Sequence, residues 1–533
     1  MSNGVNTTWA DAVGLLRGTE NVDLGMVPSE ALRPSDERHE ALPVASVAIE
    51  GQERVVAIDL KTIATHGLVW GHPETGKTKL LRLLARAWMP ETPTATRTLS
   101  VVDCTGGLVR ALAIDAAATA LALDERSRVE FARSFHVITL DAERFTPMDL
   151  YRVPPGMHAS LLADLRAESM TFALDRHLPG LERYGLALLC RVAIALGLGV
   201  TTELAHALFG DEHARRTIAD RLAANRDLHG VVGRIETMLS SDIRTALRRH
   251  VAVLTEHRPA RVVFGLSSRA ATSLMPGRSS ERFSFQSFGQ CPPPLALALT
   301  MNALVDRLNT ALERKDALSE LCIIEDAHDL VQNPFVASYL LGATSKLAGN
   351  GLSLIVCAPW LRCVFPSHLF HELARSVRWC AAFRCFSEDA ALLRDYLPTE
   401  RDVVATNLLG SLSWLGSDAS SSGIWKAFEN QMGWIPAHHF AFWSKGVSPF
   451  IVRTKAPVNL ERARRFDLLT TFAEEIAARS MVWFHDAEKL IEDDIRQLTQ
   501  GELAPAPDVP EAPRPVGVDA LFAEIASRRK ELS

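Results

Sequence analysis

Apolar positions in the first 150 residues follow strand-like and helix-like patterns in turn. The β-branched runs PVASVAIEG and RVVAIDL flank a Gly51-Gln52 turn, which predicts a hairpin. The short apolar runs HGLVWG, TLSVVDC and FHVITLD are candidates for buried strands, and helical stretches such as LLRLLARAW separate them. Strands that alternate with helices are typical of a parallel, doubly wound α/β sheet.

Helical periodicity replaces the strand signals between about Leu150 and Val251, which predicts an all-helical insertion within the α/β core. Strand-like runs then resume with RVVFG, RFSFQSF, LCIIED, GLSLIVCA and VRWCAAFRC. Two further strand-like runs near the end of the core, HHFAFW and FIVRT, predict an edge hairpin.

These patterns divide the chain into six predicted segments. They are an N-terminal arm (1–40), the first part of the α/β core (41–150), the helical insertion (151–255), the second part of the core (256–457), C-terminal helices (458–502), and a Pro-rich linker with a terminal amphipathic helix (503–533). The terminal helix carries an apolar stripe at Val518, Leu521, Phe522 and Ile525. We expect it either to dock in the groove of a protein partner or to fold back on its own core.

Composition narrows the class of protein. The formal net charge of −6 excludes a histone-like, whole-chain cationic field, so nucleic-acid binding requires a local basic patch. The first residues show no secretory signal, and the longest apolar run, residues 186–200, is interrupted by Arg191. We therefore expect a soluble cytoplasmic protein without an integral membrane segment. None of the 8 cysteines lies in a two-residue-spaced pair, which favours buried, reduced thiols.

Residues 71–78 match the pattern of a phosphate-binding loop between an apolar strand and a helix. The expected nucleotide-binding residues are Gly71, His72, Pro73, Glu74, Thr75, Gly76, Lys77 and Thr78. In such loops the backbone N–H groups surround the β-phosphate, a lysine contacts the β- and γ-oxygens, and a hydroxyl ligates Mg²⁺. We therefore expect Lys77 to be catalytic and Thr78 to be a metal ligand. The alternative is a glycine-rich turn that binds no nucleotide.

Two acids, Glu325 and Asp326, follow the apolar run at residues 321–324. Glu325 stands where an acid usually faces the magnesium shell, and Asp326 where a carboxylate usually activates water. We expect both to be catalytic and to lie in the metal site. The usual order is Asp then Glu, so the assignment of roles within the pair stays open. The alternative is a strand end capped by two solvated acids.

The ordered set HGLVWGHPETGKT, VVDCTGGL, TPMDL, IIEDAHDL and KLAGNGLSLIVCAPW resembles the HerA/FtsK superfamily of DNA-pumping ATPases, which includes conjugative coupling and type IV secretion motors. The resemblance covers roughly residues 45–455, with Asp103 and Gly106 matching the acid and glycine turn that end the family's second strand. It implies a RecA-like fold, Mg²⁺ and ATP as ligands, and a hexameric ring that acts on DNA. It also implies an arginine acting from the neighbouring subunit, and Arg378 stands where the family has a basic residue.

This sequence departs from the family pattern at three places. Ala358-Pro359-Trp360 replaces the stretch in which the family has a γ-phosphate-sensing Gln. Leu347-Ala348-Gly349 replaces a Gly-Arg-Lys, and Gly107 replaces an acidic turn residue. The departures concern the coupling of hydrolysis to movement and leave the nucleotide-binding pattern intact.

Several other candidates are less specific. We expect His72 to fill space in the loop without a chemical role. We expect His328 to form a hydrogen bond with Asp326 or the nucleotide, or alternatively to make a structural contact at the start of a helix. The basic runs at 248–250 and 462–465 are expected to be solvated helix faces, with DNA contact as the alternative. A surface or salt-bridge role is the alternative for Arg378.

The sequence therefore predicts a RecA-like P-loop ATPase whose ring translocates double-stranded DNA or a DNA–protein complex. The alternative is a slowly hydrolysing, nucleotide-gated assembly subunit of a secretion or defence complex, which the missing Gln and the reversed acids favour. A DExH-type helicase is a further competitor because of the EDAH sequence. That class does not place an all-helical block between its phosphate loop and its acids.

Overall fold

The structure is a computed structural model. It describes residues 41–49, 52–89, 97–122, 131, 134–153, 157–274, 282–289, 291–313, 319–331, 336–337, 340, 351–359, 376–386, 388–389, 432–444, 450–454, 466–478 and 480–500. Outside the described residues lie the predicted N-terminal arm, the linker and terminal helix at 503–533, the basic run at 462–465, and the departures at Gly349 and Trp360.

The chain divides into two compact units, each of which is built from three stretches. Unit 1 comprises Met1–His136, Glu281–Phe285 and Arg314–Ile476, and unit 2 comprises Val137–Ser280, Gln286–Glu313 and Ala477–Ser533. The segment boundaries predicted from the sequence remain predictions.

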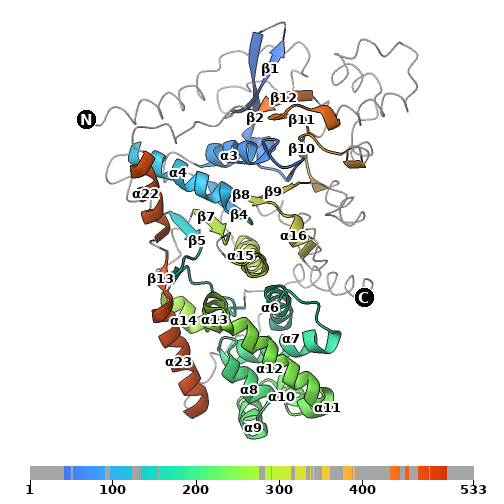
Figure 1. The fold of residues 1–533 in the computed structure, drawn as a ribbon, viewed down its shortest axis with the longest axis vertical. Helices are drawn as coiled ribbons and strands as arrows, with labels where there is room; N and C mark the ends of the chain where they lie inside the picture. The colour runs from blue at the N-terminus through green and yellow to red at the C-terminus, as the bar shows by residue number, and fades with distance from the viewer. Residues whose placement is uncertain are drawn as a thin grey trace. The chain divides into compact units, whose positions relative to one another are not determined.

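Unit 1 is organised around an 11-stranded sheet with the order β2-β1-β12-β11-β10-β3-β9-β8-β4-β7-β5, whose last two strands continue into unit 2 (Figure 1). The strands are β1 (Ala41–Ile49), β2 (Gln52–Asp59), β3 (Gly67–Trp70), β4 (Arg97–Asp103), β5 (Phe135–Ile138), β7 (Phe283–Ser287), β8 (Ser319–Glu325), β9 (Leu352–Ala358), β10 (Trp379–Ala382), β11 (His439–Ser444) and β12 (Phe450–Thr454). The helices are α2 (Leu60–Ile63), α3 (Lys77–Trp88), α4 (Gly107–Ala122), α16 (His328–Val331) and α22 (Phe466–Ala478), the last of which ends in unit 2.

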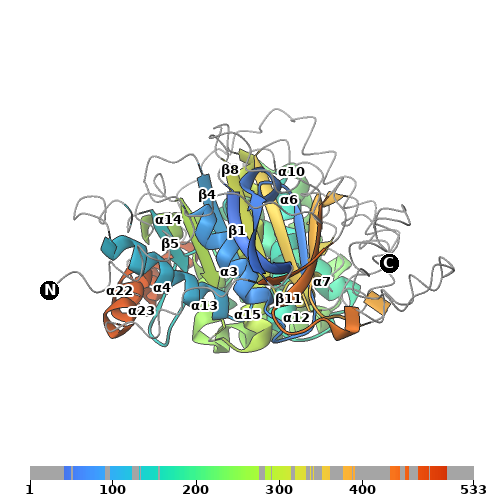
Figure 2. The same cartoon turned by 90° about the horizontal axis from the view of Figure 1, so that it is seen from above.

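The centre of the sheet, β10-β3-β9-β8-β4, is parallel throughout, and the strands beyond β10 are antiparallel. One strand, β9, therefore separates the strand before the phosphate loop from the strand before the acids, as in RecA-like α/β folds. Helix α3 packs against β8, β4 and α4 (Figure 2). The predicted α/β fold is confirmed, and both predicted hairpins, β1-β2 and β11-β12, are present. The prediction that β11-β12 lies at the edge of the sheet is wrong, because β12 also pairs with β1 and the edge strand is β2.

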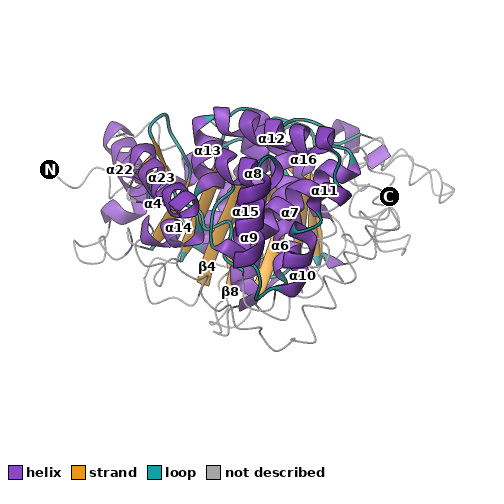
Figure 3. Ribbon diagram, turned by 90° about the horizontal axis from the view of Figure 1, so that it is seen from below, coloured by secondary structure: helices purple, strands orange, loops and turns teal. Residues whose placement is uncertain are grey.

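Unit 2 is mainly helical. Its helices are α6 (Ala159–Ala173), α7 (Gly180–Leu196), α8 (Thr202–Phe209), α9 (Glu212–Arg221), α10 (Arg226–Val232), α11 (Ile235–Met238), α12 (Ser241–Glu256), α13 (Arg258–Gly265), α14 (Ser268–Leu274), α15 (Pro293–Glu313) and α23 (Phe484–Gln500), with a small sheet of β6 (Arg144–Phe145) and β13 (Val482–Trp483). Helices α7, α8 and α12 contact one another (Figure 3). Side-chain caps from Thr201, Asp211, Asn225 and Ser240 begin four of these helices.

The strand predicted for RVVFG is wrong, because these residues belong to α13. Pro259 stands in the first turn of the helix, where its fixed φ favours helix initiation. Val262, Val263, Phe264 and Gly265 are all buried, so the four residues after Arg261 contain no polar position that would reveal the helical period. A short, fully buried apolar run cannot be distinguished as strand or helix by pattern alone.

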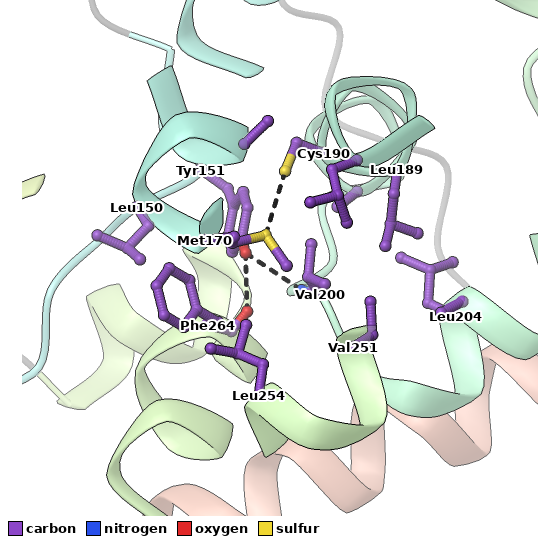
Figure 4. Close-up of a cluster of buried hydrophobic side chains, with 14 of the residues drawn as sticks. Leu150, Tyr151, Met170, Leu189, Cys190, Val200, Leu204, Val251, Leu254 and Phe264 are labelled. Carbon is purple, nitrogen blue, oxygen red and sulfur yellow. Dashed lines mark hydrogen bonds between the residues drawn. The ribbon is translucent and has the colours of Figure 1, made fainter. Parts of the chain in front are cut away.

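The core of unit 2 gathers around α7 and α12 (Figure 4). The buried Tyr151 hydroxyl donates to the carbonyl of Phe264 at 2.8 Å and accepts from the amide of Val200 at 3.3 Å, and burial raises the pKa of this phenol. Most of the long apolar run is buried within and just after α7. In the described part of the chain, no helix is long and apolar enough to cross a lipid bilayer.

Replacing Gly199 by alanine is expected to destabilise the protein by more than about 3 kcal/mol, because overpacking against fixed backbone is not relieved by a rotamer change. A Cβ at position 199 would lie 2.0 Å from the carbonyl oxygen of Gly265. Chemical denaturation of the variant measures the effect. Gly230→Ala, in α10, is the matched control because its Cβ would meet only the far end of Arg234 at 3.9 Å. Equal stability of the two variants would contradict the close approach of Gly199 to Gly265.

Candidate functional site

The phosphate loop connects β3 to α3 and has the backbone geometry of a curled amide loop. Gly71 and Gly76 adopt φ values of +144° and +113°, and Glu74 adopts +62°. A Cβ at Gly71 would lie 2.5 Å from the Cβ of Phe383, so both conformation and space require glycine. The loop leads into the N-terminus of a 12-residue helix, where unpaired amides and the helix dipole attract anions.

Lys77 is held over this loop. Its ammonium donates to the carbonyl oxygens of Gly71 at 2.6 Å and His72 at 2.8 Å, and only 7% of the residue is exposed. The hydroxyl of Thr75 donates to the same His72 carbonyl at 2.7 Å. The cation therefore already lies within the curl of the loop, where a bound phosphate would replace the carbonyl oxygens as its partner.

The structure brings the loop and the first acid together. The hydroxyl of Thr78, in the first turn of α3, donates to Oε1 of Glu325 at the end of β8, at 2.5 Å. Glu325 is 3% exposed, and its Oε2 has no hydrogen-bond partner among the described residues. A buried carboxylate oxygen without a partner, beside a hydroxyl, is a donor set that suits a divalent cation with phosphate and water as its other ligands.

The electrostatics of Glu325 indicate a site prepared for positive charge. Burial raises the pKa of Glu325 to about 8, with further contributions from Asp103 and Asp326, while Thr78 and Lys77 act in the opposite direction. Asp103 is the register partner of Glu325 on β4, so two acids end adjacent strands at the same edge of the sheet. Perturbed acids of this kind cluster at functional sites.

The two neighbouring aspartates differ in what they do. Asp103 is fully buried and its oxygens accept from the amides of Thr105, Gly106 and Val109, so it shapes the turn into α4. Asp326 is half-buried, adopts φ +50°, and begins the turn that leads to His328 at the start of α16. Asp326 as a residue is therefore less buried than Glu325.

Arg378 and Arg384 lie at opposite ends of β10. Trp379 pairs with Gly67 and Ala382 with Trp70, so Arg378 precedes the strand at the edge away from the phosphate loop. Arg384 follows the strand, and its carbonyl accepts from the amide of His72 at 2.8 Å. Of these two arginines, Arg384 therefore lies nearer to the loop of its own chain. The action of Arg378 on a neighbouring subunit stays a prediction. Arg375 lies outside the described residues.

In unit 2, the segment at residues 146–150 that forms part of the resemblance makes buried structural contacts. Asp149 accepts from the amide of Arg152 at 3.0 Å and from the hydroxyl of Ser268 at 2.7 Å. The Thr146 hydroxyl donates to the carbonyl of Val137 at 2.7 Å. These bonds fix the path of the chain between β6 and α6.

Two residues beside the loop were not identified from the sequence. The backbone N–H of His438, which adopts φ +65°, donates to the carbonyl of Thr75 at 2.7 Å. The ring of Phe386, which is 52% exposed, makes an edge contact with the ring of His72 at 4.2 Å between centroids. Burial and Arg384 lower the pKa of His72, so its imidazole contributes as a neutral ring. No local pattern marks His438 or Phe386, because Phe386 reaches the loop through the pairing of β10 with β3, and His438 through the pairing of β11 with β10.

No protein-family model matches the chain, and no curated protein matches it significantly. Among solved structures, the chain is similar to the plasmid coupling protein TrwB in complex with the ATP analogue ADPNP, with 14% identity, 83% of this chain and 96% of that chain covered, and a TM-score of 0.47. It is also similar to VirB4 of Thermoanaerobacter pseudethanolicus (15% identity, 78% and 96% covered, TM-score 0.40). The cytoplasmic domain of the type VII secretion ATPase EccC of Thermomonospora curvata shows 16% identity over 86% of this chain and 34% of that chain, with a TM-score of 0.32.

Proposed function

We propose that this protein is a P-loop ATPase that binds Mg²⁺ and ATP at the carboxyl edge of its parallel strands. One observation carries the proposal, namely the hydrogen bond between Thr78 and the buried Glu325 across β9, with Oε2 of Glu325 left without a hydrogen-bond partner in the described structure. A turn that binds no nucleotide has no need to place a raised-pKa acid against the hydroxyl that follows the loop lysine.

Each residue then has a definite task. The loop amides and Lys77 bind the β- and γ-phosphates. Thr78 and Glu325 orient Mg²⁺, which when bound neutralises charge on the phosphate oxygens. Asp326, the more open acid, orients the attacking water and accepts its proton. Since phosphoryl transfer depends mainly on positioning and charge, these residues suffice to assemble the half of the site that one chain provides.

The proposal that the protein is a motor goes beyond the binding and hydrolysis of ATP. A ring of the HerA/FtsK type, in which Arg378 of one subunit completes the site of the next, would couple hydrolysis to the movement of double-stranded DNA or a DNA–protein complex. The ordered motifs support it, together with the parallel strand order that places β9 between the loop strand and the acid strand.

A test combines turnover and mass. We expect steady-state ATP hydrolysis by the full-length protein to rise when long duplex DNA is added, and native mass spectrometry with ATP to show a hexamer. Turnover that ignores duplex DNA, from a protein that stays monomeric with ATP, would contradict the motor.

One observation favours the second candidate, the slowly hydrolysing assembly subunit. Strand β9 ends at Ala358, and the next residue is Pro359, which has neither a side-chain donor nor a backbone N–H to offer a γ-phosphate. ATP-dependent assembly with negligible turnover, with or without DNA, is the result that distinguishes this candidate from the motor.

A further inference from the structure

The order of the strands fixes which way a bound nucleotide must run. Strand β3 has β9 and then β8 on one side and β10 on the other. Glu325 ends β8, so the γ-phosphate end of a triphosphate, with its cation, faces the β8 side. The opposite end of the nucleotide, its ribose and base, then lies toward the β10 side of the phosphate loop.

The residues after β10 place exposed aromatic surface on that side. Phe386 keeps 52% of its surface open to solvent although it touches His72 in the loop. The contact places the ring at the beginning of the loop, and the ammonium of Lys77, near the end of the loop, donates to the backbone carbonyl of the same His72. Phe386 is thus adjacent to the phosphate site without being part of it.

A second chain segment brings another exposed aromatic to the same strand end. The amide of Cys385 donates to the carbonyl of Met432 at 3.3 Å, and Trp434, two residues later, is 84% exposed. The same segment continues to His438, whose amide binds the Thr75 carbonyl. Residues 432–438 therefore run from the neighbour of Phe386 to the phosphate loop itself.

We propose that Phe386 is the stacking platform for the base of a purine nucleoside triphosphate whose phosphates occupy the loop at residues 71–78. The inference rests on the proposed function, since it assigns the base end of the same ligand. An aromatic ring offers a π-face to a base and recognises it by stacking rather than by a pattern of hydrogen bonds. A purine presents the larger face, which is why the proposal commits to purine nucleotides.

The test separates the base from the phosphates by comparing two ligands. Isothermal titration calorimetry in the presence of Mg²⁺ measures the affinity of the full-length protein for ATP and for inorganic tripolyphosphate. We expect Phe386→Ala to weaken ATP binding about 5- to 150-fold, the range expected when one stacking ring is removed, and to leave tripolyphosphate binding unchanged. Phe386→Tyr keeps the ring and should retain the affinity for ATP. Trp483→Ala, which removes a 51% exposed aromatic from unit 2, is the matched control.

The other possible outcomes separate a failure of the stacking platform from a failure of ATP binding. If Phe386→Ala leaves ATP affinity intact, or weakens ATP and tripolyphosphate equally, the platform is overturned while ATP binding stands. The same holds if the wild-type protein binds ATP no more tightly than tripolyphosphate. If the wild-type protein binds neither ligand, the proposed function itself fails, and the inference falls with it.

Discussion

Replacing Lys77 by alanine is expected to weaken the binding of Mg-ATP at least about 100-fold and to abolish turnover. The side chain is buried and its ammonium is already aimed into the curl of the loop by the carbonyls of Gly71 and His72. Charge-assisted hydrogen bonds to phosphate from such a position are among the strongest single contacts in a nucleotide site. The loss of two such bonds lowers the affinity for the nucleotide by more than about a hundredfold. Calorimetric titration with ATP and a phosphate-release assay measure the two effects.

Lys79→Ala is the matched control for this experiment. Lys79 lies in the same helical turn and carries the same charge, but it is exposed and its ammonium lies 3.3 Å from the His438 ring. We expect its loss to change ATP affinity no more than a few-fold, because exposed charges are screened by solvent. A Lys77→Ala protein that binds and hydrolyses ATP like the wild type would refute both functional candidates.

Glu325→Gln is expected to make the ligand-free protein more stable at alkaline pH while impairing its binding of the metal nucleotide. The folded protein raises the pKa of Glu325 from 4.5 to about 8, so the protonated carboxyl is the favoured form. The stability associated with that proton is fully present below about pH 4.5 and is lost as the pH rises through about 8. The total loss is about 3 to 5 kcal/mol, since one pKa unit corresponds to about 1.4 kcal/mol. Glutamine does not ionise and avoids this loss.

Thermal unfolding between about pH 4.5 and pH 8.5, without nucleotide or Mg²⁺, measures the effect. The wild-type Tm should fall across this window more steeply than the Tm of Glu325→Gln. Glu320→Gln, on the same strand, should keep the wild-type slope, because Glu325 is intact and glutamine still accepts the hydrogen bond from Ser100. Parallel slopes for wild type and Glu325→Gln would show that Glu325 ionises without a cost in stability. The claim that the folded protein holds a destabilised negative charge ready for a cation would then be wrong.

Local sequence patterns predicted the structure most reliably where the types of residue and their spacing indicated the same element. The β3 strand, the glycine-rich loop and the first turn of α3 form one continuous motif, and each of its parts requires specific residues in a fixed order. The pair Glu325-Asp326 was recognisable because two acids follow four apolar residues, which is the pattern of a buried strand that ends at a polar edge. After Arg261 the run RVVFG has no polar position to indicate its period, and it is helical because it continues the helix that begins around Pro259.

The sequence by itself determined which residues can form the loop, because only glycine tolerates the φ values and the close approach of Phe383 at position 71. It also determined that the acids end a strand. Only the tertiary structure decided that Thr78 meets Glu325, that Asp103 stands beside that acid, and that Phe386 and His438 border the loop. These contacts join residues that are far apart in the chain, and they depend on which strands pair and in which register. No local period encodes that choice, since strand pairing is selected by the packing of the whole sheet.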